Sequence, residues 1–262
     1  MTPEEMGSRL LYRDGLMLII DKPAGVAVHR GPKGGQSLED SFDALRFGLP
    51  RLPALAHRLD KETSGCLVLG RHRKALADLS LLFRHGKVDK TYWAVVEGGP
   101  DAAEGRIDLP LGRLDDKIGW WMKHDPEGLP SSTTWTAMGR TDGLTWLALK
   151  PLTGRTHQLR VHCATMGFPI LGDDIYGKEA ALRRARKESP PRRDGPRLHL
   201  HAREIVVPLY KNRPPIKAVA PVPRHMVERL KACGWNEDED RALPAPLGLS
   251  GPRAEHPATR NS

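Results

Sequence analysis

Short apolar runs recur along the chain and predict the strands of a sheet. The runs are rich in aliphatic, β-branched and aromatic residues and are bounded by Gly, Pro or charged residues, which is typical of buried strands. We predict strands at 16–20, 26–29, 67–69, 90–97, 133–138, 144–149, 198–202 and 205–207. The region 100–130 is rich in turn residues and predicts short hairpins, and 214–223 predicts an extended segment.

Apolar residues spaced by three and four positions predict four helices. They lie at 38–45 after a capping Ser37, at 73–84, from 156 to 166, and at 225–233. Gly86 and Gly167 follow two of these segments, where glycine commonly ends a helix. Strands and helices are mixed rather than strictly alternating, which favours an α+β fold with a mixed, largely antiparallel sheet flanked by helices.

The length of 262 residues suits one sizeable domain or two small ones, and we expect a single main domain over 10–232. The tail at 233–262 is acidic at first and then rich in Pro, Gly and Ala, so we expect it to be disordered. No apolar run approaches the ~20 residues of a membrane span, and no secretory signal begins the chain. The three cysteines, Cys66, Cys163 and Cys233, have neither metal-ligand spacing nor a disulfide pattern, which predicts a reducing cytoplasm.

The net charge of +9 indicates a polyanionic partner. The segment 178–197 holds eight Lys or Arg against three Asp or Glu. We interpret it as a solvated, mobile insertion that attracts phosphates without regard to base sequence.

Two dense polar blocks are the candidates for chemistry. The first, 57–65, places the single carboxylate of Asp60 in a loop directly before a buried strand. Asp60 lies either in a solvated surface loop or at the mouth of a cleft. Gly65 permits the sharp bend that a position at a cleft requires. The second, 150–162, places Arg155 at a strand-to-helix junction, where it either reaches across a cleft or forms a structural salt bridge, as Arg160 also can.

Other chemistries have weaker support. His157 with His162, or His199 with His201, supplies two metal ligands but no evident third, so we expect no metal. His57, Asp60 and Ser64 are the residue types of a hydrolase triad, but the G-x-S-x-G nucleophile elbow is absent. Phosphate-binding and dinucleotide-binding glycine motifs are also absent.

The polar blocks and several other motifs resemble the RluA-type pseudouridine synthases. His57-Arg58-Leu59-Asp60 with Thr63-Ser64-Gly65 is similar to the HRLDxxTSG signature of that family. Four further motifs occur in the family's order, and together the resemblance covers 16–226. They are DKPxG at 21–25, KxYxA at 90–94, TGRxHQxR at 153–160 and the LHA strand at 198–202. An S4-like module is not evident, and Val206-Val207-Pro208-Leu209 replaces the family's Phe-x-His-Pro.

The resemblance implies a pseudouridine synthase fold with a central cleft and a cofactor-free isomerisation of specific uridines in rRNA or tRNA. It implies that Asp60 is the catalytic aspartate, that Tyr92 packs on the target base, and that Arg155 pairs with the aspartate. Arg58 matches the arginine associated with displacing the uridine from its stack.

Further residues of the two polar blocks are predicted to bind substrate. They are His57, Thr63, Gln158 and Arg160. The predicted partner is structured RNA, with no membrane and no metal, and we expect a monomer. The alternative is a non-catalytic RNA-binding or RNA-folding protein on the same scaffold.

Overall fold

The computed structural model describes residues 1–31, 34–114, 121–186 and 198–238. Within these ranges the helices are α1 (Pro3–Gly7), η1 (Leu38–Leu45, a 3₁₀ helix), α2 (Arg73–Arg84), α3 (Gln158–Thr165), α4 (Lys178–Ala185) and α5 (Arg224–Ala232). The strands are β1 (Leu10–Arg13), β2 (Met17–Lys22), β3 (Ala54–Leu55), β4 (Ser64–Gly70), β5 (Asp89–Glu97), β6 (Glu104–Asp108), β7 (Leu111–Arg113), β8 (Met122–His124), β9 (Ser132–Thr141), β10 (Leu144–Pro151), β11 (Leu200–Val207) and β12 (Ile216–Val219).

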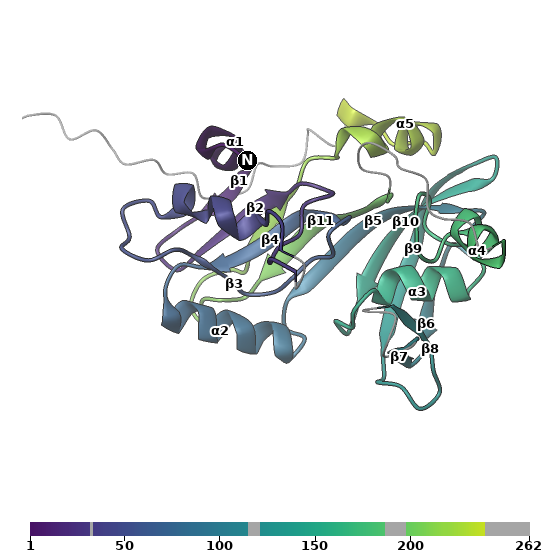
Figure 1. Cartoon of the computed structure of the whole chain (residues 1–262), viewed down its shortest axis with the longest axis horizontal. Coiled ribbons are helices and arrows are strands. Elements are labelled where there is room, and N and C mark those ends of the chain that lie inside the picture. The colour runs from purple at the N-terminus through teal and green to yellow at the C-terminus, as the bar shows by residue number, and fades with distance from the viewer. Residues whose placement is uncertain (32–33, 115–120, 187–197, 239–262) are drawn as a thin grey trace, which may run out of the picture.

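One mixed, largely antiparallel sheet organises the fold (Figure 1). Its main path runs β1-β2-β4-β11-β5-β10-β9-β6, with β12 paired to β11 and β3 to β4. Strand β11 pairs with β4 in parallel at Ser64 and Gly65, and the other pairings described are antiparallel. A Cβ on Gly65 would collide with the Ala202 carbonyl group, so only glycine permits the close parallel pairing of β4 with β11 at this position. The predicted α+β class is confirmed.

Two apolar clusters cover one face of the sheet and meet at Tyr92. One cluster joins β2, β4, α1 and η1, and includes Ile20, Leu67 and Phe42. The other joins β5, β10 and α3 through residues such as Leu149. Tyr92 on β5 packs against both clusters. The junction between the two halves of the sheet therefore lies at Tyr92.

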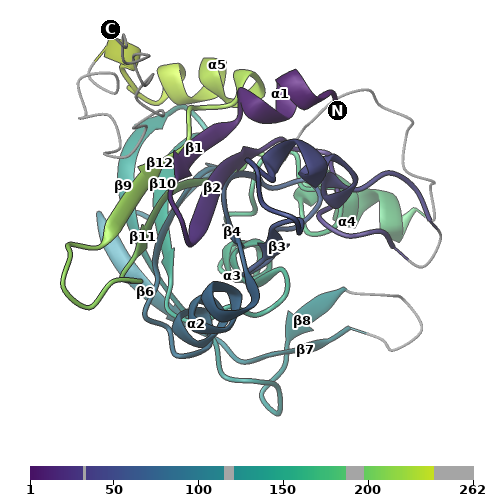
Figure 2. The same cartoon turned by 90° about the vertical axis from the view of Figure 1, so that its left-hand side faces the viewer.

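The opposite face is covered by α2 and α5. Leu79 of α2 packs in a cluster with Val68 and Val207, while Met226 and Leu230 of α5 pack in a cluster with strand residues of β5 and β10. Strands β7 and β8 form a separate hairpin that extends from the sheet (Figure 2).

Most predicted elements are present. The strands predicted at 16–20, 67–69, 90–97, 133–138 and 144–149 correspond to β2, β4, β5, β9 and β10, and the helix at 73–84 matches α2. The predicted strands at 198–202 and 205–207 form the single strand β11. The helices predicted from 156 and at 225–233 correspond to α3 and α5.

The helix predicted at 38–45 is confirmed as the 3₁₀ helix η1, but two other predictions were wrong. Residues 26–29 are not a strand, because the carbonyls of Ala27 and Val28 accept hydrogen bonds from the N–H groups that begin η1. The described part of the basic segment includes the helix α4, with Ala180 buried and Arg183 paired to Glu179 at 3.3 Å.

Some predictions concern residues outside the described ranges. These are the basic residues at 187–197 and residues 239–262 of the tail that was predicted to be disordered over 233–262. The start of that tail is ordered, because Cys233 and Trp235 are buried in a cluster with Trp146 and Met226. No helix among the described residues is long and apolar enough to cross a membrane.

Candidate active site

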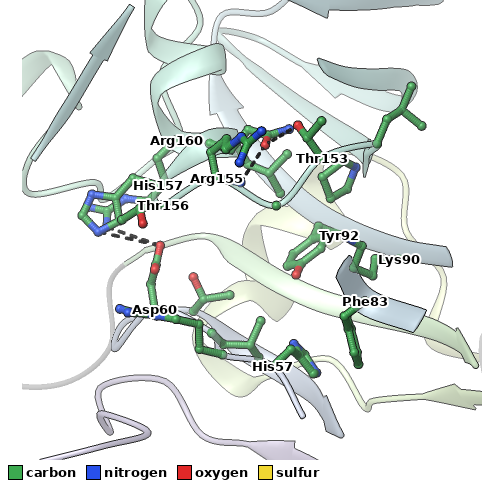
Figure 3. A pocket seen from close by; sticks show the side chains of 18 of the residues that line it. His57, Asp60, Phe83, Lys90, Tyr92, Thr153, Arg155, Thr156, His157 and Arg160 are labelled. Atoms are coloured by element: carbon green, nitrogen blue, oxygen red, sulfur yellow. Dashed lines mark hydrogen bonds and ion pairs between the residues drawn. The ribbon is translucent and has the colours of Figure 1, made fainter. Parts of the chain in front are cut away.

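A cavity of about 620 Å³ opens at Tyr92, between the two polar blocks (Figure 3). Its walls come from the loop before β4, the C-terminal end of α2, strand β5 and the loop between β10 and α3. The charged and histidine side chains that line it are His57, Arg58, Asp60, Arg84, His85, Lys90, Arg155, His157 and Arg160. Asp60 is the one carboxylate among these described lining residues.

The loop that carries Asp60 is fixed from behind by the 21–25 motif. The Lys61 carbonyl accepts hydrogen bonds from the backbone N–H of Gly25 at 2.9 Å and from Lys22 Nζ at 2.9 Å. Lys22 is fully buried, and burial lowers its pKa to about 7 although Glu62, Asp60 and Asp21 act in the opposite direction. The motif therefore holds the backbone next to Asp60 in place.

Arg160 and His157 are the side chains that face the Asp60 carboxylate, Arg160 as its ionic partner. Arg160 Nη1 and His157 Nε2 each lie 3.9 Å from the same oxygen, Asp60 Oδ2. The Asp60 side chain is 20% exposed, against 6% for Arg160 and 12% for His157. The site thus holds a carboxylate that meets the cavity and two nitrogen donors mostly withdrawn from solvent.

Arg160 is held by a second, buried carboxylate. Its Nε and Nη2 each donate a 2.7 Å hydrogen bond to Asp173, which also accepts from the backbone N–H groups of Ile175 and Tyr176. Burial alone would raise the pKa of Asp173, but these bonds and the Arg160 charge hold it below its usual value. The bidentate geometry fixes the guanidinium beside Asp60.

The predicted pairing of Arg155 with Asp60 is not present. The Arg155 side chain is exposed at the cavity, and its Nε donates to the Pro130 carbonyl at 3.2 Å. It lies in the loop before α3, whereas Arg160 projects from the first turns of the helix. The sequence block contains both arginines, and the structure places the second one beside the aspartate.

Tyr92 lines the cavity between the clusters. Burial, with the charge of Asp60 as a second cause, raises its pKa above the ordinary value, so its hydroxyl stays neutral. Its ring therefore offers an aromatic wall within electrostatic reach of Asp60.

Two predicted substrate-binding side chains are engaged in holding the site together. His57 Nε2 accepts a 3.0 Å hydrogen bond from the backbone N–H of Val68, and its ring stacks on Phe83. Gln158 is 4% exposed and uses both amide atoms, donating to Ser132 and Thr133 and accepting from Thr153 and from the Arg155 backbone. Arg58 and Thr63 line the cavity, Arg58 exposed and Thr63 buried.

Sequence reasoning did not assign His157 and Tyr176 to this site. His157 is in the left-handed region with φ of 53°, and its Nδ1 lies 2.9 Å from the Tyr176 hydroxyl. The signal in the sequence was the position of His157 inside the same polar block as Arg155 and Arg160. Tyr176 follows Asp173 by three residues in a turn-rich segment, a spacing that carried no obvious chemistry.

The other histidines considered as metal ligands have separate partners. His162 bonds Ser131 and Thr133, and His201 Nδ1 lies 2.8 Å from the Ser64 hydroxyl. Across the described ranges, no three His, Cys, Asp or Glu side chains are grouped to hold a metal. Ser64 is 2% exposed and does not line the cavity, so the hydrolase triad of His57, Asp60 and Ser64 is not assembled.

Lys90 is the cation that β5 contributes to the described lining of the cavity. It lies two residues before Tyr92, so both side chains project from the same face of the strand. Burial lowers the pKa of Lys90. Among the described residues the Lys90 ammonium has no hydrogen-bond or ion-pair partner, which leaves it available to a ligand.

Comparisons with known proteins agree with this geometry. The family model described as RNA pseudouridylate synthase matches residues 16–165. A Zymomonas mobilis protein named as an uncharacterized RNA pseudouridine synthase is 42% identical over 221 residues, covering 84% of this chain and 95% of the relative. A Vibrio cholerae protein named ribosomal large subunit pseudouridine synthase C is 39% identical over 176 residues, covering 66% of this chain and 54% of the relative.

Solved structures show the same fold. Human RNA pseudouridylate synthase domain containing 4 superposes with a TM-score of 0.70 at 26% identity, over 88% of this chain and 95% of that chain. Human RNA pseudouridylate synthase domain containing 1 gives a TM-score of 0.67 at 27% identity, over 90% and 96%.

Proposed function

Because the chain belongs to the RNA pseudouridylate synthase family and isomerises uridine to pseudouridine in RNA, we propose that Asp60 starts that reaction. The supporting observation is that Asp60 is the single carboxylate among the described residues of a cavity otherwise lined by cationic, histidine and aromatic side chains. Arg160 supplies the partner charge that sequence reasoning assigned to Arg155.

The isomerisation breaks the N1–C1′ bond of uridine and forms a C5–C1′ bond. The C5 proton is lost to a base and N1 gains a proton, so atoms balance with no oxidant, reductant or cofactor. A carboxylate serves either as a nucleophile at C1′ or as a base that removes the C2′ proton to give a glycal. Asp60 suits both routes, because Arg160 compensates its charge without covering it.

Tyr92 and Arg58 have roles that follow from their positions. We assign Tyr92 to hold the released uracil against its ring while the base turns to present C5. A uridine in structured RNA must first leave its stack, which costs a few kcal/mol. Arg58 is exposed at the cavity and is suited to fill the space that the uridine vacates.

We place the substrate in structured RNA, with large-subunit rRNA as the first candidate and tRNA as the second. The net charge of +9 and the arginine and lysine side chains around the cavity favour contact with phosphates. The name of the Vibrio cholerae relative supports rRNA. A non-catalytic RNA-binding protein is disfavoured, since such a protein gains nothing from a carboxylate that faces anionic RNA.

The remaining features of the proposal concern the whole protein. We propose one catalytic domain over 10–232, to which Met6 and Trp235 add buried contacts at either end. We further propose that it acts as a cytoplasmic monomer, with no metal or cofactor in the reaction.

The test is tritium release from RNA labelled at uridine C5. The purified chain is incubated separately with large-subunit rRNA transcripts and with tRNA transcripts. We expect tritium to enter water with rRNA, and pseudouridine mapping in cells with and without the gene then locates the position. Release from tRNA alone would mean that tRNA, and not rRNA, is the substrate. No release from any cellular RNA by folded protein would contradict the catalytic function.

A further inference from the structure

The contacts of Asp60 are distributed unequally between its two oxygens. Arg160 Nη1 and His157 Nε2 both approach Oδ2 at 3.9 Å. In the described part of the chain, Oδ1 has no hydrogen bond or ion pair. The carboxylate therefore has one oxygen directed to protein donors and one that is free to meet a substrate.

The partners of His157 determine which ring nitrogen carries hydrogen. The Tyr176 hydroxyl accepts a 2.8 Å hydrogen bond from the backbone N–H of Met122, at the start of β8. Its own hydrogen is then available for His157 Nδ1, 2.9 Å away. With Nδ1 as acceptor, the neutral ring carries its hydrogen on Nε2, where it faces Asp60. The other tautomer would direct a lone pair at the carboxylate.

The backbone of His157 adds a second constraint. Its φ of 53° is uncommon for a residue with a side chain and is found mostly where the surrounding structure requires it. Residue 157 immediately precedes α3, so this conformation sets the direction in which the imidazole leaves the loop. The strained backbone and the Tyr176 hydrogen bond together direct the ring at Asp60.

We propose that His157 is a positioning residue for Asp60, and that its Nε2–H holds Oδ2 so that Oδ1 is presented to the ribose of the target uridine. Tyr176 acts through His157 by fixing its tautomer. Both contacts are 3.9 Å long, and we expect them to shorten to hydrogen-bond distance in the complex with substrate, as catalytic hydrogen bonds commonly do. This inference rests on the proposed role of Asp60 and extends it to the groups that aim the carboxylate.

The experiment is chemical rescue in a His157→Gly variant, because glycine adopts a positive φ without strain. We expect kcat on the RNA substrate to fall by ~10-fold to ~100-fold with KM within about twofold, since a misplaced reactive group slows the chemical step. Added imidazole should restore kcat. N-methylimidazole, nearly the same shape but unable to donate from a neutral ring, should not.

A second variant guards against a folding defect. Asparagine also tolerates the left-handed region, so His157→Asn keeps the backbone but its shorter amide cannot contact Tyr176 and Asp60 together. We expect the same fall in kcat, and a smaller fall in Tyr176→Phe. Wild-type kcat in folded His157→Asn overturns the proposal, as does an equal effect of the two imidazoles in the glycine variant.

Asp60→Asn, measured alongside, separates this inference from the proposed function. Full activity in Asp60→Asn removes the role of Asp60 itself. An inactive Asp60→Asn together with an unimpaired His157→Asn removes only the positioning role of His157.

Discussion

The two polar blocks that form the cavity use their side chains differently. In the first, His57 is directed at the backbone of β4 and Thr63 is buried. Asp60 is the described residue of this block that carries a negative charge into the cavity. In the second, Gln158 holds the loop while Arg160 and His157 both face Asp60. One block therefore presents the reactive group, and the other supplies the groups that aim and compensate it.

The difference shows that the contacts of a side chain indicate whether it supports the fold or takes part in the reaction. The residue type alone does not. His57 and His157 are both histidines that line the same cavity. His57 Nε2 accepts a hydrogen bond from a backbone N–H, whereas His157 Nε2 faces a carboxylate. Replacing each residue therefore affects a different property of the protein.

Arg160→Met should produce the largest change in both stability and turnover. It leaves the buried Asp173 carboxylate without its bidentate partner, which costs ~3–5 kcal/mol of unfolding free energy. It also removes a partner of Asp60, so kcat should fall ~100-fold under conditions where the variant is folded. Urea unfolding and single-turnover kinetics measure the two effects. A variant with wild-type stability would show that the Asp173 pair is not structural.

His57→Leu should affect stability but leave kcat per folded molecule close to wild type. It leaves the N–H of Val68 without its acceptor, a cost of ~1–3 kcal/mol. Burial lowers the pKa of His57 to about 3, whereas the unfolded chain takes up the proton near the ordinary value of about 6.5. Wild-type stability from His57 therefore declines as pH falls between these values, so the cost of the variant should shrink toward pH ~4.

The matched control for His57 is His85→Leu, which changes an exposed histidine at the same cavity. Unfolding curves of both variants between about pH 8 and about pH 4 provide the comparison. A pH-independent difference between wild type and His57→Leu would contradict the assignment of His57 as a neutral structural histidine.

Lys90→Met should raise the stability of the protein and lower its activity. It removes a cation that is desolvated without a described partner, so the unfolding free energy should rise by ~0.5–2 kcal/mol. Loss of a charged hydrogen bond to RNA should lower kcat/KM about tenfold. Lys87→Met, at an exposed position just before β5, is the control. Unchanged kcat/KM in Lys90→Met would mean that the ammonium does not meet the substrate.

Arg155→Ala should give the smallest effect. The side chain is exposed and its described hydrogen bond is to the Pro130 carbonyl, so stability should change by less than ~0.5 kcal/mol. RNA binding should weaken, and the slope of log affinity against log salt should decrease by about one if Arg155 contacts a phosphate. Binding titrations at several salt concentrations measure that slope. A fall in kcat as large as that of Arg160→Met would restore Arg155 as the partner of Asp60.

The sequence predicted those features that depend on local pattern. Alternation and helical spacing located β5, β10 and α2, and the motif order identified the family. The motifs also selected Asp60, which lines the cavity and whose catalytic role stays a prediction. Features that depend on long-range placement were missed or misassigned. The spacing of Arg155 and Arg160 does not reveal which one projects toward the aspartate, because that depends on where the loop ends and α3 begins.

The same limit applies to residues 26–29 and to Tyr176. The apolar run at 26–29 has strand composition, but its carbonyls accept hydrogen bonds from the start of η1. The period of apolar residues carries no information about contacts between residues so far apart in the chain. Tyr176 reaches His157 because Asp173, which pairs with Arg160, also accepts the backbone N–H of Tyr176 and so fixes its turn. Only the assembled structure brings these residues together.

The most direct measurement is turnover by Asp60→Asn on RNA that the same preparation is shown to bind. The substitution keeps the size of the side chain and removes its charge and nucleophilicity. The account predicts that tritium release falls on the order of 10⁴-fold or more while RNA affinity stays within a fewfold of wild type. Turnover near the wild-type rate, with contaminating enzyme excluded, would contradict it.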